Sequence, residues 1–455
     1  MMENDMARTK AALGHGARLT DYLSTSLLAR VYPPWLIGEL LDSHQCNSQR
    51  QRSFPATAVV YYCMALSLYP EAAYADVFDA VAQGLAWRSR DDAPTSIKAS
   101  SISAARSRLP WQMFKALQER ACRPMAVAAS CPDAFYRGLR LMAMDGSNFE
   151  VPDEPENIAA FGYPGSRTGV AGYPQAQCAV LVECATHAIV GANIGAYRDA
   201  EWTVCKPLLA HLDASMLCMA DRGFNGYEYW CSAQATGAQL LWRCASNRQL
   251  PVIKPLADGS FISELRPSKG PARKDKSAAM AVRVIEYALP GARGGANGDE
   301  TRYRLLTTLL DESQAPALEL AALYHERWEV ESVFDELKTH LHQRRRVLRS
   351  KKADLVRQEF YGWVLAHYAV RWLMYSAGNA HAVAPRRLSF VANVQLLRRA
   401  QPQSGAFPPS APNTSQAMVC PGVGASGIFG LRQQPGPVSI KSSDGQEAKL
   451  TLRQP

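Results

Sequence analysis

The sequence has no paired cysteines of the kind that bind zinc or form a redox centre. Its eleven cysteines include no CxxC pair and no metal-ligand spacing, and their number is odd. Scattered reduced thiols are typical of a protein from a reducing compartment. The sequence therefore predicts neither a zinc site nor a disulfide framework.

Long apolar runs are also absent. The stretch Thr57–Tyr69 is too short to span a bilayer, and His367 and Arg371 interrupt the stretch Phe360–Tyr375. The N-terminal residues show no signal-peptide pattern. From these features we expect a soluble protein of the cytoplasm.

No segment matches the phosphate-binding loop GxxxxGK[ST], so nucleotide hydrolysis is not indicated. Positive charge, in contrast, is plentiful, with a net charge of +9 that favours a polyanionic partner. Residues 338–357 contain eight Lys or Arg and a single acid, Asp354, for a net charge of +7. At the centre of this basic segment are Arg344, Arg345 and Arg346. The segment favours nucleic acid as the partner, and a solvated basic face is the ordinary alternative.

A chain of 455 residues is long enough for two or three domains with separate cores. Apolar spacing, with Pro and Gly between the segments, predicts helices at 34–41, 56–68, 72–83 and 110–123. A small helical DNA-binding domain fits residues 1–130, and Arg106 and Arg108, which follow a run of serines, are its candidate DNA contacts. A helical scaffold that does not touch DNA fits these residues nearly as well.

The pattern changes to strands from about residue 135, and two of these strands lead into acids. Leu139–Ser147 is an apolar strand that runs into Asp145 and Gly146, and Ser215–Phe224 repeats the arrangement with Asp221. Ligands bind at the carboxyl ends of the strands in open α/β sheets. Either aspartate alone could simply cap a turn. The two together predict a site.

Residues 235–312 are expected to form a β-rich insertion, with strands at 239–244, 261–265, 282–289 and 303–310 between loops rich in Pro, Gly, Lys and Arg. A long helix is predicted at Leu355–Ser376. The last segment, 386–455, is rich in Pro, Gly, Ser and Gln beyond about residue 400, and we expect a poorly ordered tail there. The segment between the first helices and this tail, 131–385, would be one α/β domain.

A third acid lies on a predicted amphipathic helix at Tyr324–Lys338, which contains no Gly or Pro. At 100° per residue, Arg327, Glu331 and Lys338 fall within roughly 60° of Tyr324 on one face of the helix. The apolar side of the same helix would pack against a core. Charge pairs on an exposed helix are the usual reason for such spacing, and on the helix alone that alternative is favoured.

Three carboxylates from two strands and a helix suit a pair of hard divalent cations with oxygen ligands, normally Mg²⁺ or Mn²⁺. Two such ions support in-line displacement at a phosphodiester, for which Arg327 and Lys338 would supply phosphate-binding donors. This chemistry needs no ATP, in agreement with the missing phosphate loop. If Glu331 pointed away from the other two acids, Asp335 on the same helix face would take its place.

The spacing Tyr324-x2-Arg327-x3-Glu331-x6-Lys338 resembles the Y-x2-R-x3-E-x6-K signature of DDE transposases of the insertion-sequence-four family. Asp145, in a strand-Asp-Gly-Ser setting, is similar to the first acid of that family, and Asp221, in Asp-Arg-Gly-Phe, is similar to its second. Between the second and third acids lie 109 residues, a long interval similar to that of members that carry a β-strand insertion domain there. Residues 99–109 also resemble the N-terminal domain of the family.

The resemblance implies a ribonuclease-H-like catalytic core, and cut-and-paste transposition by hydrolysis and strand transfer at inverted-repeat ends. It implies that Asp145, Asp221 and Glu331 are the catalytic acids and the ligands of two Mg²⁺ or Mn²⁺ ions. By the same resemblance, the Tyr, Arg and Lys of the signature would bind terminal DNA phosphates within a homodimer on paired ends in the bacterial nucleoid.

Members that form a DNA hairpin hold a flipped base on an aromatic side chain of the insertion. Trp242 is the tryptophan within the predicted insertion, so the resemblance makes it the candidate for holding the flipped base. The ordinary alternative is that it is a buried packing residue of a strand.

Two other classes of protein stay open at this point. A DNA-binding protein derived from a transposase would keep the fold without cleavage, although the presence of all three acids argues against it. A two-carboxylate glycosidase is also conceivable from the acids alone. The donors beside Glu331 and the basic segment that follows it disfavour that class.

Overall fold

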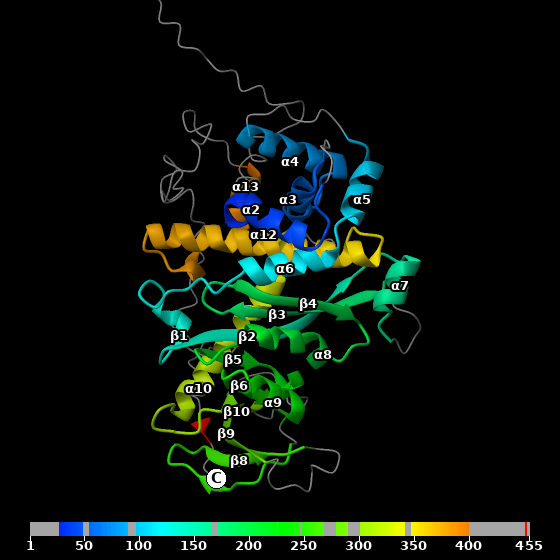
Figure 1. Ribbon diagram of the computed structural model, residues 1–455. Helices are drawn as coiled ribbons and strands as arrows, with labels where there is room; N and C mark the ends of the chain where they lie inside the picture. Colours follow the sequence, from blue (N-terminus) through cyan, green and yellow to red (C-terminus); the bar gives the residue numbers. More distant parts are fainter. Residues whose placement is uncertain are drawn as a thin grey trace, which may run out of the picture.

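In the computed structural model, a helical N-terminal region is followed by a mixed β-sheet whose faces are covered by helices (Figure 1). The residues described are 27–48, 54–89, 97–165, 172–224, 226–245, 248–267, 279–289, 301–341, 347–399 and 451–452. The coarse prediction of a helical region followed by an α/β region is confirmed.

The N-terminal region consists of α2 (Pro34–Ser43), α3 (Ala56–Leu68), α4 (Tyr74–Ser89), α5 (Ala99–Ser107) and α6 (Trp111–Ala121). A proline stands immediately before α2, α3 and α6, where its fixed φ and missing N–H suit the start of a helix. Helix α3 is apolar on all sides and is buried along almost its whole length, as such helices are. The helices predicted from apolar spacing are confirmed here.

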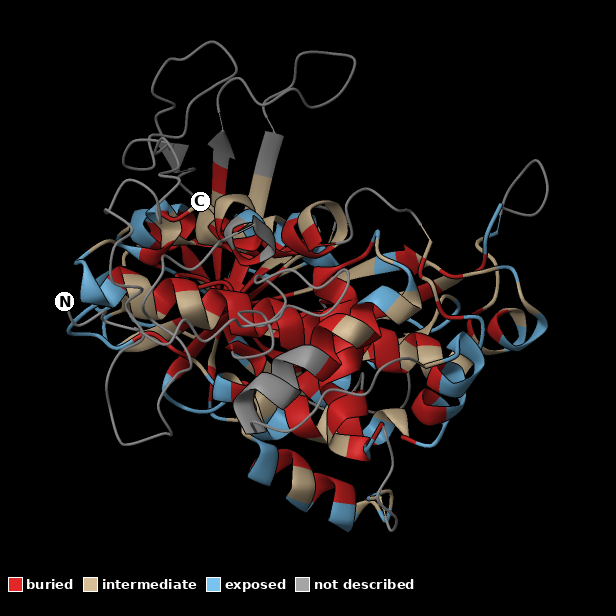
Figure 2. Cartoon of the chain, turned by 90° about the horizontal axis from the view of Figure 1, so that it is seen from above, coloured by how far each residue is buried: buried red, intermediate tan, exposed pale blue. Residues whose placement is uncertain are grey.

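Helix α12 (Ala353–Ala380) crosses the molecule between the N-terminal helices and the sheet (Figure 1). It packs against α3 on one side and, together with α6, against β4 on the other (Figure 1). Gly362 allows close approach to α3, because a Cβ at that position would lie 2.6 Å from the backbone oxygen of Cys63. Seen from above, buried residues fill the middle of the molecule and most exposed residues lie around its periphery (Figure 2).

The sheet has eleven strands, and its main path runs β4-β3-β2-β5-β6-β10-β9-β8-β7, with β1 beside β2 and β11 beside β9. The first five strands in sequence are β1 (Phe135–Tyr136), β2 (Leu139–Glu150), β3 (Gln175–Glu183), β4 (Ala188–Ala196) and β5 (Met216–Ala220). They are followed by β6 (Gln239–Cys244), β7 (Lys254–Pro255), β8 (Phe261–Leu265), β9 (Met280–Leu289), β10 (Thr301–Thr307) and β11 (Thr451–Leu452). Strands β2, β3 and β4 are antiparallel, whereas β5 runs parallel to β2 and β6 parallel to β5.

The predicted insertion differs from the observed fold at its first strand. β6 is parallel to β5 and belongs to the central part of the sheet, and the antiparallel strands β7 to β10 extend the same sheet from its edge. The buried guanidinium of Arg283 on β9 helps to fix this extension, because it donates to Asp258, Ser260 and the backbone oxygen of Ala315.

The remaining helices are short and connect or cover the strands. Those before residue 240 are η1 (Pro132–Ala134), α7 (Pro155–Phe161), α8 (Glu201–Cys205), η2 (Lys206–His211), η3 (Arg222–Phe224) and α9 (Tyr227–Gln234). Those after residue 310 are α10 (Ala317–Tyr324), η6 (His325–Trp328), α11 (Glu329–Asp335), η7 (Glu336–Leu341), η8 (Pro385–Arg387) and α13 (Phe390–Arg399). None of the described helices is both long enough and apolar enough to cross a membrane.

The predicted tail at 386–455 is wrong over its first part. Helix α13 occupies Phe390–Arg399, and Phe390 and Val394 on its inner side are buried against the main core. Apolar residues at this helical spacing form a face that packs on the core. The prediction missed it because it relied on the Pro, Gly, Ser and Gln content of the residues that follow. Beyond residue 399, only the two residues of β11 lie within the described part of the chain.

Candidate active site

The first two acids of the site lie next to each other on adjacent parallel strands. The last residue pair that joins β2 and β5 is Met144 with Ala220; Asp145 is the next residue of β2, and Asp221 immediately follows β5. Contrary to the prediction, β2 does not end at Asp145 but continues to Glu150, paired with β3 and, at Glu150, bridged to Val347. Parting of the strands therefore opens the sheet beside the two aspartates, as expected of a site at the carboxyl ends of parallel strands.

The third acid comes from a helical segment of changing pitch. The predicted single helix is three joined pieces: the 3₁₀ turn η6, the α-helix α11 with Glu331, and the π-helical η7 with Lys338. Val330, Leu337 and Leu341 of this segment are fully buried, as the apolar spacing predicted. π-helical turns inside α-helices are frequent at functional sites.

Arg327 joins the helix to the sheet. Its guanidinium donates to Asp145 Oδ2 at 3.2 Å and to Glu331 Oε1 at 3.2 Å, so the cation lies between two of the three acids. The Arg327 side chain is only 6% exposed, whereas the carboxylate of Glu331 is 43% exposed. The ion pair between Arg327 and Glu331, which an ordinary surface helix would also form, is present, but Arg327 pairs in addition with Asp145 of the sheet.

The electrostatics of Asp145 reflect both its burial and its neighbours. Burial raises the pKa of this carboxyl above its usual value, Arg327 and the Gly146 N–H offset part of the rise, and the charges of Asp221 and Glu331 add to it. Although burial alone would lower the pKa of Arg327, Tyr324 and the nearby acids raise it. The negative charge at the site is therefore only partly compensated by this single guanidinium.

Tyr324 and Lys338 lie on either side of the acids. The Tyr324 hydroxyl donates to the backbone oxygen of Ala220 at 3.3 Å, directly before Asp221. Lys338 Nζ donates to the Ser147 hydroxyl at 2.5 Å, two residues beyond Asp145. Burial lowers the pKa of Lys338. The four signature residues therefore face one edge of β2 and β5.

Two residues of the site were not predicted from the sequence. Arg243 on β6 places Nη1 3.7 Å from Asp221 Oδ1. Glu201, the first residue of α8, lies against the backbone of Gly146 and Gly223, and burial together with the charges of Asp145 and Asp221 raises its pKa. An arginine inside an apolar strand was the available signal for Arg243, whereas no local signal marks Glu201.

Oxygen donors at the site suit a hard divalent cation. Asp221 Oδ1 is buried and accepts no hydrogen bond within the described part of the chain, so it has a free lone pair. As the side chains stand, no three His, Cys, Asp or Glu residues among those described form a ready metal site, and Arg327 lies between Asp145 and Glu331. The carboxylates of Asp145, Asp221 and Glu331 fit such an ion if Arg327 gives up its hydrogen bonds to Asp145 and Glu331.

Several residues proposed from the sequence lie away from the site. Arg106 is 2% exposed and donates to Gln358, Ser350 and the Leu355 backbone oxygen, so it anchors α5 to α12 and is not a DNA contact in this conformation. Arg108 is exposed at the end of α5. Asp335 pairs with His340 at 3.1 Å and not with the other acids. Arg344, Arg345 and Arg346 lie outside the described residues.

Trp242 does not suit the role of a base-holding residue in this structure. It is fully buried on β6, stacked on Tyr229 at 5.6 Å between ring centroids and in edge contact with Trp230 at 5.1 Å. The prediction failed because the strand belongs to the interior of the sheet, where a large aromatic side chain is needed for packing.

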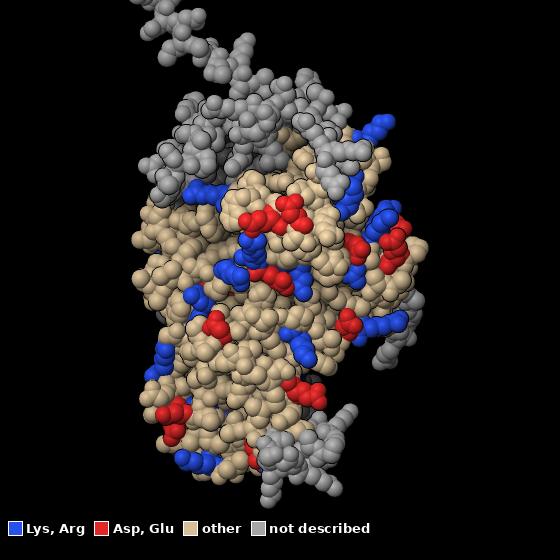
Figure 3. Space-filling model, viewed as in Figure 1, with Lys and Arg blue, Asp and Glu red and all other residues tan. Residues whose placement is uncertain are grey.

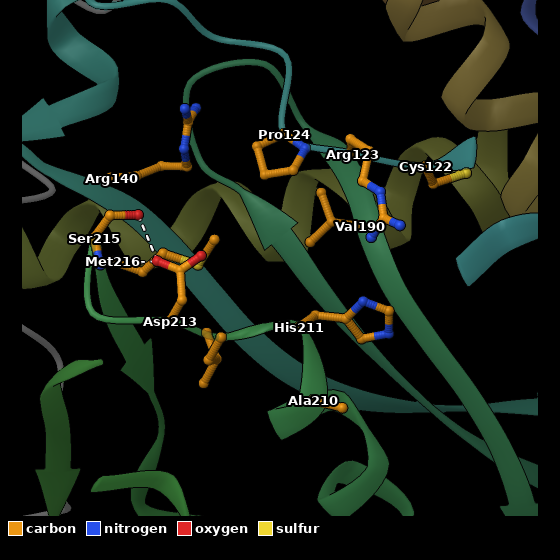
Figure 4. Close-up of a pocket in the computed structure, with 11 residues that line it drawn as sticks. Cys122, Arg123, Pro124, Arg140, Val190, Ala210, His211, Asp213, Ser215 and Met216 are labelled. Carbon is orange, nitrogen blue, oxygen red and sulfur yellow. Dashed lines mark hydrogen bonds between the residues drawn. The ribbon is translucent and has the colours of Figure 1, made fainter. Parts of the chain in front are cut away.

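A pocket of about 410 Å³ opens at the opposite end of the same strands (Figure 4). Arg140 at the start of β2 and Ser215 and Met216 at the start of β5 contribute to its lining. Arg140 precedes Asp145 by five residues, which corresponds to about 16 Å along a strand. The pocket is therefore separate from the acids.

Two acids lie at adjacent parallel strands, and the Arg327 guanidinium joins one of them to a helix that also carries Lys338. Such a site is suited to metal-assisted phosphoryl transfer. The comparisons with known proteins agree with this class. The Transposase DDE domain family matches residues 136–368, and the Insertion element 4 transposase N-terminal family matches residues 23–119. The chain belongs to the Transposase DDE domain family, and its N-terminal residues match the N-terminal family of insertion element 4 transposases.

Two curated relatives come from Escherichia coli (strain K12). The transposase InsG of insertion sequence element IS4 is 29% identical over 271 residues, which are 59% of this chain and 60% of that protein. The putative transposase InsZ is 23% identical over 144 residues, or 31% of this chain and 48% of that protein. The chain thus spans about half to three fifths of the length of these relatives.

Among solved structures, a piggyBac transposase synaptic complex with hairpin DNA matches 83% of this chain and 78% of its own chain, at 10% identity and a TM-score of 0.38.

Proposed function

We propose that the protein is a transposase that hydrolyses phosphodiester bonds at the inverted-repeat ends of an insertion sequence and joins the freed ends to target DNA. The observation that carries this proposal is the bridge that Arg327 makes from Asp145 to Glu331, with Asp221 on the adjacent strand. Hydrolysis consumes water and gives a 3′-hydroxyl and a 5′-phosphate. Strand transfer exchanges one phosphodiester for another, so neither step needs ATP.

The arrangement of strands supports a ribonuclease-H-like core for this activity. An antiparallel meander of β2, β3 and β4 is extended on the other side of β2 by the parallel strands β5 and β6. Within such a core, residues 131–385 would be the catalytic domain, residues 1–130 the DNA-binding domain and residues 386–455 the C-terminal segment. Strands β7 to β10 would be an insertion between Asp221 and Glu331.

Asp145, Asp221 and Glu331 would hold two Mg²⁺ or Mn²⁺ ions, which when bound polarise the scissile phosphate and activate the attacking oxygen. Arg327 now bonds oxygens of Asp145 and Glu331, the residues that would hold the ions, and in the metal-bound protein its guanidinium would be available to a DNA phosphate. Lys338 and Tyr324 would bind phosphates on either side of the acids. The partner would be double-stranded DNA, bound by a homodimer in the cytoplasm, at the nucleoid.

The test is metal-dependent nicking of a labelled duplex that carries the terminal repeat found in the DNA flanking the gene. Asp221→Asn should abolish nicking with Mg²⁺ and with Mn²⁺ but leave binding of the duplex largely intact, because the change removes a cation ligand and keeps the side-chain size. Asp133→Asn, at an exposed aspartate, is the matched control and should nick like wild type. Binding without nicking by the wild-type protein would instead favour a DNA-binding protein that has lost cleavage.

A further inference from the structure

Glu201 is placed at the centre of the site by packing and not by any sequence signature. It opens helix α8, which follows β4 and packs against β2, β3 and η3. Its carboxylate lies directly over the backbone that follows each catalytic aspartate. A Cβ at Gly146 would be 2.5 Å from Glu201 Oε1, and a Cβ at Gly223 would be 2.6 Å from Oε2.

These two glycines therefore make room for a carboxylate. Gly146 is the residue after Asp145, and Gly223 is two residues after Asp221. A Cβ at either position would force the end of the Glu201 side chain to move, because each glycine lies against one oxygen of its carboxylate. Without that close approach, the carboxylate would lie farther from both aspartates.

No charge compensation accompanies this placement. Within the described ranges, Glu201 makes no ion pair and accepts no hydrogen bond, whereas Asp145 has Arg327 and Asp221 has Arg243. The charged groups that influence it are the carboxylates of Asp145 and Asp221. An ionised, partly buried carboxylate with two acids for neighbours and no donor among the described residues is costly, and either a proton or a cation shared with those acids would relieve the cost.

We propose that Glu201 is a fourth carboxylate of the active site, which binds a divalent cation together with Asp145 and Asp221. This inference rests on the proposed function and extends it, since the family signature and its two aspartates do not include this residue. Hard divalent cations take six or more oxygen ligands, so a fourth carboxylate completes a coordination shell that Arg327 now partly blocks. Glu201 would reach the ion from α8, across the space that Gly146 and Gly223 leave by having no side chain.

The experiment measures Mn²⁺ binding to the full-length protein, by titration calorimetry and by the loss of the free-ion signal in electron paramagnetic resonance. Glu201→Gln keeps the shape and removes the charge, and should weaken Mn²⁺ binding by roughly tenfold or more. The control Glu228→Gln changes an exposed acid in the first turn of α9, and should bind Mn²⁺ like wild type. Unchanged Mn²⁺ affinity in Glu201→Gln would overturn the proposal.

A thermal unfolding series separates a ligand from a residue that only supports the fold. Without metal, Glu201→Gln should raise the melting temperature, because it removes repulsion from two aspartates. With Mn²⁺, the same variant should lose most of the stabilisation that wild type gains from the ion. A lower melting temperature in both conditions would mean that Glu201 is structural, and would overturn the proposal.

Asp145→Asn distinguishes failure of this inference from failure of the proposed function. If Asp145→Asn weakens Mn²⁺ binding and Glu201→Gln does not, the site binds metal without Glu201 and only the present inference fails. If neither substitution changes Mn²⁺ binding, the acids do not form a metal site and both proposals fail.

Discussion

Arg327 shows how a single residue connects the sheet to the helix. Its guanidinium is almost fully removed from water, yet its Nε has no hydrogen-bond partner among the described residues. A planar, permanently charged group suits two carboxylates in different elements, and later a phosphate, better than a lysine would. The signature spacing identified Arg327 from the sequence, because positions four apart on a helix face the same side.

Glu201 and Arg243 could not be identified in the same way. Glu201 stands between Ala200 and Trp202 without a recognisable motif, and only the packing of α8 brings it to Gly146 and Gly223. A role that depends on contacts between segments distant in sequence leaves no local pattern. The sequence thus predicted Asp145, Asp221 and Glu331, which belong to recognisable patterns, and missed Glu201, which belongs to none.

At the level of single residues, chemistry and binding should separate at Glu331 and Lys338. Glu331→Gln removes the charge that would hold a cation and keeps the side-chain size, so it should bind a terminal-repeat duplex nearly as well as wild type but show no nicking. Lys338→Ala removes a phosphate donor and should bind the duplex less tightly, with some metal-dependent nicking retained. A gel shift beside a nicking reaction on one labelled duplex measures both.

Wild-type nicking by Glu331→Gln would exclude Glu331 from the cation site. Loss of all nicking by Lys338→Ala at saturating protein would show that Lys338 does more than bind DNA.

Among the elements, α3, β6 and β8 have the bounds that the sequence predicted, because Pro or Gly limits them and apolar spacing runs through them. The pitch of the signature helix was not predicted. The carboxylate of Glu336, at the start of η7, is hydrogen-bonded to His187 of the β3–β4 turn and to His367 and Arg371 of α12. These partners come from distant segments, so helical periodicity alone could not show where the helix would widen.

The buried cluster around Glu336 should make stability depend on acid pH. Despite its burial, Arg371 and His187 hold the pKa of Glu336 well below its usual value, so its stabilisation is complete above the unfolded value of about 4.3 and is lost as the pH falls further. Burial lowers the pKa of His367, so the unfolded state takes up its proton first, and stability already declines below about pH 6.5. Glu329, which pairs with His187, belongs to the same cluster.

Glu336→Gln should lower the free energy of unfolding by roughly 3 kcal/mol near neutral pH, because it leaves Arg371 buried without its anionic partner. Urea unfolding from about pH 7 to about pH 2 should show the gap to wild type narrowing as the pH falls below about 4.3, because the unfolded state then binds a proton that the folded carboxylate of Glu336 still resists. Glu156→Gln, at an exposed acid on α7, is the control. A gap that does not change with pH would mean that the ionised state of Glu336 is not what stabilises the fold.

Over the whole molecule, positive charge is not gathered into one band on the face that Figure 3 shows. Lysine and arginine are interspersed there with aspartate and glutamate (Figure 3). The net charge of +9 therefore says less about a DNA path than the basic segment at 338–357 does. The sequence locates that segment directly after the signature helix.

Replacing Arg344, Arg345 and Arg346 together with alanine should weaken DNA binding without regard to sequence. If all three contact phosphates, the slope of log K against log salt should fall by up to about 2.7, because fewer counterions are released. Filter binding or fluorescence anisotropy at several salt concentrations measures the slope. Lys254→Ala, at an exposed lysine on β7, should change neither quantity. An unchanged affinity and slope in the triple variant would show that the segment is only solvated.

Helix α12 touches both α3 and β4, and the main apolar cluster contains residues of the N-terminal helices and of the sheet alike. These contacts join the two regions through one continuous apolar core. A DNA end seated on the helices would meet the acids at a set number of base pairs from its contact point. The place of the cut would then follow from the thickness of a helix layer, with no need for the acids to read any base.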